Sequence, residues 1–242
     1  MKSILLSYAS KGREDYRNGM LSLIDSALLH WKGDMKMYSP DHWLEEYKGV
    51  KITKEMPDDM LPHSEMPYQF KSAMIHDALK SGYERIVWLD TSITINKDLT
   101  PLFDDELGIT CFHNLGHPLK NYISDDALKL LGNPQLEDVS INNGIVTVTD
   151  LIPQIWGGAL LFNFKNMNTH GLFKDIQYFS TNGSFKDGGS TRKGFVAHRH
   201  DQAVMSVLLH NKCNLQPYGK IALKQHAISG EYGNDIYLIY GK

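Results

Sequence analysis

The feature that most constrains this chain is a short apolar run, Ile86 to Leu89, that stops abruptly at Asp90. A hydroxyl side chain, Ser92, follows two residues later. The run has the length and composition of a buried strand. In α/β proteins the carboxyl end of such a strand is where ligands are held, so a carboxylate there is better placed for chemistry than for packing. The segment therefore predicts an α/β fold with a polar ligand site around Asp90.

The size and composition of the chain exclude several classes of protein. Its 242 residues are enough to bury a substantial core, and 42% hydrophobic and 22% charged residues are ordinary globular usage. A net charge of −3 gives no basic footprint for nucleic acid. Two cysteines, Cys111 and Cys213, cannot make a disulfide-rich secreted fold. Neither cysteine lies in a CxxC pair, so we expect a reduced, cytoplasmic setting. No run approaches the roughly 20 apolar residues of a membrane span, so we expect no transmembrane segment.

Strands and helices alternate along the first half of the chain. Apolar residues recur at helical spacing from Met20 to Trp31, and again from Phe70 to a stop at Gly82. Such alternation predicts a mixed, mostly parallel sheet flanked by helices. A final helix should begin near His200. The strands that we expect are 3–8, 35–39, one ending at Asp90, 108–112 and 158–163.

The whole chain, 1–242, reads as a single domain with a regular and an irregular half. Periodicity weakens after about residue 112, where Asn142, Asn143 and Gly144 indicate a turn between two strands. The segment 181–191 is rich in Gly, Ser, Asn and Asp, which predicts a mobile surface loop.

Three segments occur in an order that resembles glycosyltransferases with the GT-A fold. The acidic strand tip is followed by a turn and short helix from Asp98 to Phe103. The run Trp156 to Asn163 resembles the small-residue strand that closes the donor-sugar pocket, and His200 to Val204 resembles the Asp-Gln helix of nucleotide-sugar transferases. The resemblance implies a Rossmann-like nucleotide-diphospho-sugar transferase domain. In it, residues 1–112 would bind the nucleotide, and residues 113–242 the sugar and the acceptor.

The same resemblance implies an activity and a set of site residues. A sugar would move from a nucleoside-diphosphate sugar, most often a UDP-sugar, to a hydroxyl of a glycan. Asp201 and Gln202 are the catalytic candidates. The Asp-Gln helix favours retention of the anomeric configuration, whereas inversion would require a carboxylate such as Asp201 to deprotonate the acceptor. The donor-binding candidates are Tyr8, Ala9, Lys71, Asp90, Ser92, Gly157 and Gly158.

A departing diphosphate develops negative charge, which a divalent cation or basic side chains can stabilise. GT-A transferases commonly hold that cation with an Asp-x-Asp motif, and here Ser92 replaces the second Asp. The resemblance implies Mn²⁺ or Mg²⁺ bound by Asp90 and by a late histidine, His226. Because serine contributes no charge, Ser92 weakens the expected metal site.

Several of the candidates also have a purely structural explanation. An Asp that ends a strand can simply cap the next turn, and an Asp at the start of a helix is a common N-cap, which covers Asp90 and Asp201. Gly157 and Gly158 can relieve crowding within a sheet, or they can let a ligand approach the backbone closely. A lysine in a first helical turn, as expected for Lys71, is usually solvated.

Other functions stay open from the sequence. Sugar-nucleotide nucleotidyltransferases share the expected fold, but their Gly-rich loop is absent from Ser7 to Arg13, which contains one glycine. A non-catalytic carbohydrate-binding or nucleotide-binding protein is compatible with Ser92. His198 and His200 form a pair typical of metallohydrolases, although further ligands at recognisable spacing are missing.

Overall fold

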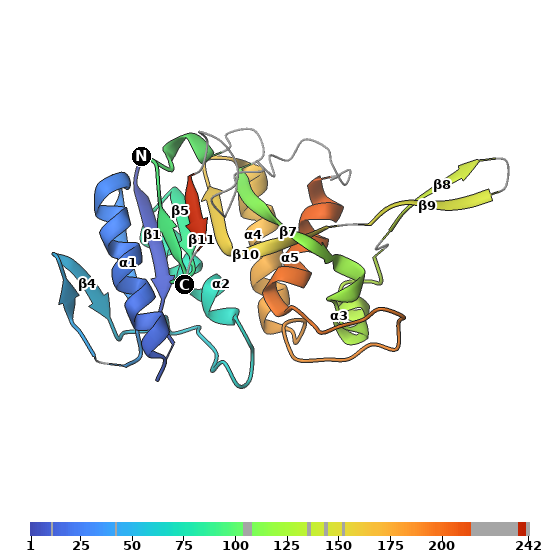
Figure 1. Cartoon of the computed structure of the whole chain (residues 1–242), viewed down its shortest axis with the longest axis horizontal. Coiled ribbons are helices and arrows are strands. Elements are labelled where there is room, and N and C mark those ends of the chain that lie inside the picture. Colours follow the sequence, from blue (N-terminus) through green and yellow to red (C-terminus); the bar gives the residue numbers. More distant parts are fainter. Residues whose placement is uncertain are drawn as a thin grey trace.

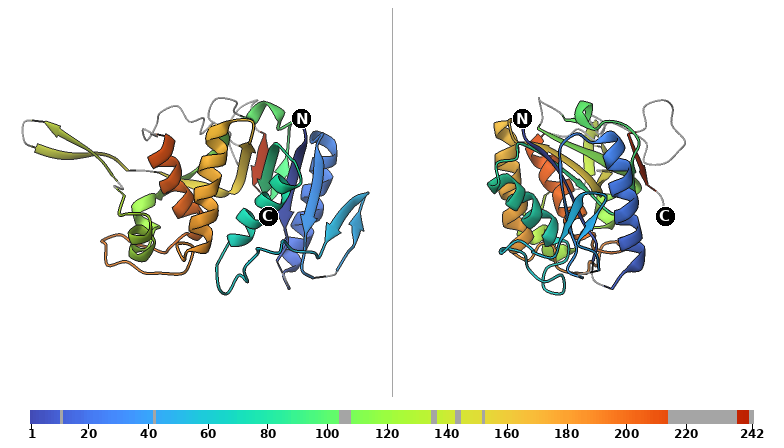
Figure 2. Two further views of the ribbon diagram at one scale, coloured as in Figure 1. Left: turned by 180° about the vertical axis from the view of Figure 1, so that it is seen from behind. Right: turned by 90° about the vertical axis from the view of Figure 1, so that its left-hand side faces the viewer.

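The computed structural model describes residues 1–10, 12–41, 43–103, 108–134, 137–142, 145–151, 153–213 and 237–240. Within these residues a seven-stranded sheet has the order β3-β4-β2-β1-β5-β10-β7 (Figure 1). Helix α1 covers one face of this sheet, and helices α2 and α4 lie over the other face (Figure 2). The described helices are α1 (Glu14–His30), α2 (Gln69–Lys80), α3 (Asp125–Leu130), α4 (Met167–Thr181) and α5 (His200–Cys213), with short 3-10 turns η1 (Thr100–Leu102) and η2 (Leu119–Asn121).

The sheet is mixed. Strands β4, β2, β1 and β5 are parallel to one another, β10 is antiparallel to β5, and β7 is antiparallel to β10. Strand β7 therefore runs in the same direction as β5, and the predicted mixed α/β architecture is confirmed. The described strands are β1 (Ser3–Tyr8), β2 (Asp34–Tyr38), β3 (Glu46–Tyr47), β4 (Val50–Thr53), β5 (Arg85–Leu89), β6 (Ile93–Ile95), β7 (Ile109–Pro118), β8 (Glu137–Asn142), β9 (Ile145–Leu151), β10 (Pro153–Asn163) and β11 (Leu238–Tyr240).

Strand β1 shows why the centre of the sheet reads as a continuous apolar run. Successive side chains of a strand point to opposite faces. Leu5 packs in the hydrophobic cluster beneath α1 with Met20, and Leu6 packs in the cluster beneath α2 with Met74. Both leucines are fully buried. A strand covered by helices on both faces is buried on both sides, which accounts for the consecutive apolar residues Ile4, Leu5 and Leu6 of β1.

The parallel pairing of β1 with β5 puts their carboxyl ends at one edge of the sheet. Strand β1 ends at Tyr8, and β5 ends at Leu89, so Asp90 is the first residue beyond the strand. The backbone N–H of Asp90 donates to the carbonyl of Gly158 on β10 at 2.8 Å. Residues from both halves of the chain therefore meet at this edge.

The second half of the chain contains elements that the sequence analysis did not predict in full. Strands β8 and β9 pair as an antiparallel hairpin that extends away from the body, on either side of the expected turn (Figure 1). Helix α4 was not predicted. Its first turn is capped by Asn166, whose side chain accepts from the N–H of Asn168 at 2.9 Å.

The segment 181–191 begins with the last residue of α4. Two of its side chains, Ser184 and Phe185, are buried, and several of the following residues are exposed. Its mobility stays a prediction. In the described part of the chain, no helix combines the length and the apolar character needed to cross a bilayer.

Candidate functional site

The site is built around a buried lysine. Lys71 lies on α2, and its side chain is only 6% exposed. Its Nζ donates to the carbonyl of Gly157 on β10 at 2.8 Å and lies 2.9 Å from Oδ2 of Asp201 on α5. Oδ1 of Asp90, beyond β5, lies 3.6 Å away. Burying an ammonium group is costly unless it is paired and hydrogen-bonded, and here separate elements of the fold supply the partners.

The charges of the two carboxylates keep this lysine protonated. Burial alone would lower the pKa of Lys71, but the negative charges of Asp201 and Asp90 outweigh it and raise that pKa above its usual value. Burial also raises the pKa of Asp201, against the opposing effect of the Lys71 ammonium. The site therefore holds a fixed positive charge between two carboxyl groups.

Asp90 differs from Asp201 in its surroundings. Its side chain is 39% exposed, whereas that of Asp201 is 4% exposed. The indole N–H of Trp88 donates to Oδ1 of Asp90 at 2.9 Å, which orients the carboxylate. Asp90 is thus held in position and still open to a ligand.

Gly157 and Gly158 of β10 lack room for a side chain for different reasons. A side chain at Gly157 would bring its Cβ to 2.7 Å from Cγ of Gln202 and 2.8 Å from Oδ2 of Asp201. A Cβ at Gly158 would instead meet the ring of Trp156 at 2.4 Å. Gly157 therefore lets the Asp201 and Gln202 turn approach the strand, and Gly158 accommodates a neighbouring indole.

The structure thus brings five of the predicted residues together and leaves others at the margin. The assembled residues are Lys71, Asp90, Gly157, Asp201 and Gln202. Tyr8 lies at the neighbouring strand end, where its ring is 4.5 Å from that of Phe70. The side chain of Ala9 is fully buried, and its N–H bonds to the carbonyl of Tyr38, while Ser92 is partly buried. His226 lies outside the described residues.

Comparison with protein-family models and with curated proteins gives no match. Among solved structures, mouse xyloside xylosyltransferase 1 in its apo form matches with a TM-score of 0.54 and 13% identity, over 100% of this chain and 98% of that one. This chain has the fold of a glycosyltransferase.

Two further solved structures match over most of this chain. The glycosyltransferase GlyE of Streptococcus pneumoniae TIGR4 has 12% identity and a TM-score of 0.47, over 88% of this chain and 44% of that one. The bifunctional glycosyltransferase WbbM has 12% identity and a TM-score of 0.48, over 87% of this chain and 38% of that one. This chain spans less than half the length of either.

A divalent cation at Asp90 would need several oxygen or nitrogen ligands around it. In the described ranges, no three His, Cys, Asp or Glu side chains converge as a metal cluster. The Lys71 ammonium already lies between the carboxylates of Asp90 and Asp201. Asp90 is the carboxylate of this cluster with an exposed face. The described residues alone therefore do not make a complete cation site in this glycosyltransferase fold.

The histidine pair that suggested a metallohydrolase has another role. Nδ1 of His198 accepts from the N–H of Ser124 at 3.2 Å, and its Nε2 is 2.9 Å from the carbonyl of Ser184. Burial lowers the pKa of His198 to about 4, so the ring is neutral at neutral pH. With both ring nitrogens bonded to backbone, His198 ties two loops together and has no lone pair left for a metal.

Sequence reasoning missed Trp88 and Tyr68 at this site, and it considered His200 only as a metal ligand. Trp88 orients Asp90, and the ring centroids of Trp88 and Tyr68 lie 5.7 Å and 5.3 Å from Nζ of Lys71. The ring of His200 lies 5.2 Å from that of Tyr68. Tyr68 is one helical turn before Lys71, and His200 immediately precedes Asp201. The signal that could have identified these residues is their closeness in the sequence to Lys71, Asp90 and Asp201.

Proposed function

We propose that this chain is a glycosyltransferase that moves a sugar from a nucleoside-diphosphate sugar, a UDP-sugar in the first instance, to a hydroxyl of a glycan. The observation that carries the proposal is the Lys71 ammonium held between Asp90 and Asp201 at the carboxyl edge of the sheet. Ligands of open α/β sheets bind at this edge. The fold shared with a xylosyltransferase supports the same conclusion.

The proposed chemistry assigns a role to each charged group. When the bond from the anomeric carbon to the phosphate oxygen breaks, the diphosphate leaves with the electron pair and gains negative charge. A fixed ammonium in a water-poor site stabilises such charge, which is the role that we give to Lys71. Asp90, with its exposed face, would contact the nucleotide sugar. Asp201 would position Lys71 and, with Gln202, face the transferred sugar.

We propose retention of the anomeric configuration. An inverting transferase needs a base that removes the proton from the acceptor hydroxyl. The side chain of Asp201 is 4% exposed and its Oδ2 lies 2.9 Å from Nζ of Lys71, so this carboxylate is badly placed to reach an acceptor hydroxyl. A retaining reaction has no obligatory side-chain base, which suits this arrangement.

The proposal includes the expected cation and location. Asp90 and His226 are the ligands that Mn²⁺ or Mg²⁺ would use, and the ion would supply a Lewis acid at the phosphates. Cytoplasmic location stays a prediction.

Release of nucleoside diphosphate from a panel of UDP-sugars and GDP-sugars, with Mn²⁺ or with EDTA, tests the proposal. We expect slow hydrolysis of one donor and its loss in Asp90→Ala and Asp201→Ala. Asp126→Ala, an exposed Asp on α3, is the matched control and should keep full activity. Binding without hydrolysis would favour the non-catalytic alternative, and release of a sugar 1-phosphate with pyrophosphate present would favour the nucleotidyltransferase. Full hydrolysis in both site variants would reject the site.

A further inference from the structure

Two residues with an unusual backbone meet beside the Lys71 and Asp201 pair. Tyr68 has φ of 61° and His200 has φ of 39°, and both lie in the left-handed region that residues other than glycine rarely adopt. Their rings are 5.2 Å apart at an angle of 33°. Such conformations cost free energy and persist where the surroundings enforce them, often beside a ligand.

A third ring completes this aromatic group. The ring of His63 lies 5.1 Å from that of Tyr68 in an edge-on arrangement, and its Nδ1 accepts from the N–H of Tyr68 at 3.3 Å. Both His63 and Tyr68 are exposed, while Phe70 is buried 6.0 Å from the Tyr68 ring. The three rings of His63, Tyr68 and His200 are called the aromatic platform below.

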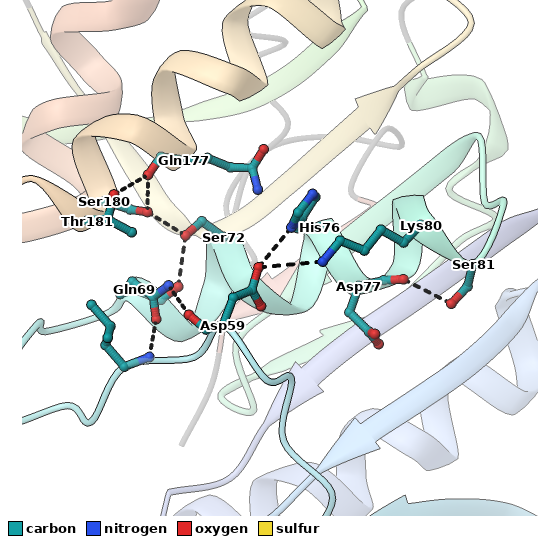
Figure 3. A network of polar contacts seen from close by, with 11 residues as sticks. Asp59, Gln69, Ser72, His76, Asp77, Lys80, Ser81, Gln177, Ser180 and Thr181 are labelled. Atoms are coloured by element: carbon teal, nitrogen blue, oxygen red, sulfur yellow. Dashed lines mark hydrogen bonds and ion pairs between the residues drawn. The ribbon is translucent and has the colours of Figure 1, made fainter.

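The platform is fixed from its α2 side by a network of polar contacts (Figure 3). The side chain of Gln69 accepts from the N–H of Leu61 at 2.8 Å and donates to the carbonyl of Asp59 at 3.1 Å. The carboxylate of Asp59 lies 2.8 Å from Nδ1 of His76. These bonds hold the segment that carries His63 and Tyr68 against α2.

The platform is also fixed from its α5 side. Nδ1 of His200 lies 2.8 Å from the carbonyl of Phe185, whose own side chain is buried in the core. A surface that is rigid before a ligand arrives loses little entropy on binding. The His200 side chain is 17% exposed and its ring lies against that of Tyr68, while the rings of His63 and Tyr68 are exposed. An exposed aromatic ring held in this way is suited to a flat, partly apolar ligand.

We propose that the aromatic platform is the acceptor subsite, and that it stacks against a pyranose ring with equatorial hydroxyls. This inference rests on the proposed glycosyltransferase function. A pyranose of this kind presents axial C–H groups as an apolar face, while its hydroxyls point outward from the rim. The platform matches both features, because Tyr68 offers an exposed flat ring whose centroid lies 5.3 Å from the Lys71 ammonium, and Lys71 is paired with Asp201.

The position of the platform distinguishes this occupant from the base of the donor. Tyr68 lies 5.3 Å from the Lys71 ammonium, and His200 precedes Asp201 on the helix that packs against β10. The nucleoside is instead expected at the end of β1, near Tyr8. A sugar on the platform would therefore have its hydroxyls close to the groups proposed to act on the transferred sugar.

The test measures binding of methyl β-D-glucopyranoside and methyl β-D-xylopyranoside by saturation-transfer NMR, in the presence of UDP. The variants are Tyr68→Ala, Tyr68→Gly and Tyr68→Phe, with Tyr178→Ala, an exposed tyrosine on α4, as control. We expect Tyr68→Ala and Tyr68→Gly to weaken glycoside binding about tenfold, and Tyr68→Phe and the control to stay within about twofold. Glycine suits the left-handed backbone, so Tyr68→Gly keeps the fold while removing the ring.

Affinity for UDP, measured by calorimetry, should be the same in all four variants. Unchanged glycoside affinity in Tyr68→Gly, or no glycoside binding by the wild type, would overturn the platform. An equal fall in UDP affinity would overturn it too, since the ring would then face the nucleotide. Failure of the glycosyltransferase proposal has a different signature, namely wild-type protein that neither binds UDP nor hydrolyses any sugar nucleotide.

Discussion

The two carboxyl groups beside Lys71 come from different regions and have different environments. Asp90 follows a strand of the first half, is 39% exposed and lies 3.6 Å from Nζ of Lys71. Asp201 is in the first turn of a helix in the second half, is 4% exposed and lies 2.9 Å from the same atom. The strand tip therefore offers a carboxylate to a ligand, and the helix start uses its carboxylate to hold the lysine.

This difference sets the expected energetics. Removing one partner of a buried ion pair leaves an uncompensated charge and costs about 3–5 kcal/mol, whereas exposed pairs contribute about 0–1 kcal/mol. Stability should thus depend on Asp201 and Lys71, while ligand binding depends most on Asp90.

The largest expected effect is that of Lys71→Met. It leaves Asp201 buried without a counter-charge, so we expect a loss of about 3–5 kcal/mol in the free energy of unfolding, measured by urea denaturation. Lys48→Met is the control, because Lys48 forms an exposed pair with Asp25 at 2.8 Å and should cost less than about 1 kcal/mol. Equal losses of unfolding free energy in Lys71→Met and Lys48→Met would show that the buried ion pair of Lys71 and Asp201 does not stabilise the fold more than an exposed pair does.

Exchanging the two carboxylates for amides separates the two regions directly. Asp201→Asn leaves the buried ammonium without its closest counter-charge, and we expect it to lose about 3 kcal/mol of stability. Asp90→Asn keeps the shape of a partly exposed side chain and should lose less than about 1 kcal/mol. Thermal and urea unfolding of both variants measure the difference. Similar losses of stability in both would contradict the claim that Asp201 stabilises the fold more than Asp90 does.

A smaller effect is expected at the strand that faces Asp201. Gly157→Ala would force the Asp201 and Gln202 turn away from β10, since its Cβ would come within 2.8 Å of both side chains. Overpacking of this kind costs about 1–3 kcal/mol. Gly171→Ala on α4 meets nothing within 4 Å and should be neutral or stabilising by up to about 1 kcal/mol. A Gly157→Ala variant as stable as the wild type would mean that the first turn of α5 can move away from β10 without loss of stability.

The smallest effect concerns the loop anchor that precedes Asp201. The pKa of His198 is lowered to about 4 by burial, below its unfolded value of about 6.5. Its stabilising contribution is therefore complete above pH 6.5 and declines as the pH falls toward 4. Between pH 7 and pH 5.5 we expect a loss of roughly 1 kcal/mol that is absent in His198→Gln. The same pH dependence of the unfolding free energy in the wild type and in His198→Gln would show that His198 does not cause the loss of stability.

The regular part of the fold could be predicted because its signals are local. Strand β1 was predicted with its observed bounds, and Asp90 was correctly placed at the tip of a buried strand, since apolar runs with abrupt ends identify strands buried on both faces. Helix α4 was missed although Leu172, Phe173 and Ile176 recur at helical spacing and are buried, and Gly171 is the one residue that weakens the pattern.

The site itself was only partly predictable. A sequence indicates that Lys71, Gly157 and Asp201 are polar or small, but their meeting depends on how separate elements pack. Lys71 was predicted as a donor-binding residue, and the alternative of a solvated lysine in a first helical turn is wrong, because Lys71 is buried. The left-handed backbone of Tyr68 and His200 could not be read from the sequence, because tyrosine does not favour that conformation and histidine, although enriched there, adopts it uncommonly.

Calorimetric titration of UDP into wild-type protein and Asp90→Asn, with Asp126→Asn as control, tests the central claim most directly. We expect Asp90→Asn to bind UDP at least about tenfold more weakly than the wild type, while its free energy of unfolding stays within about 1 kcal/mol of the wild-type value. The control should bind like the wild type. Equal UDP affinity in Asp90→Asn and wild-type protein would contradict the assignment of this strand tip to the donor.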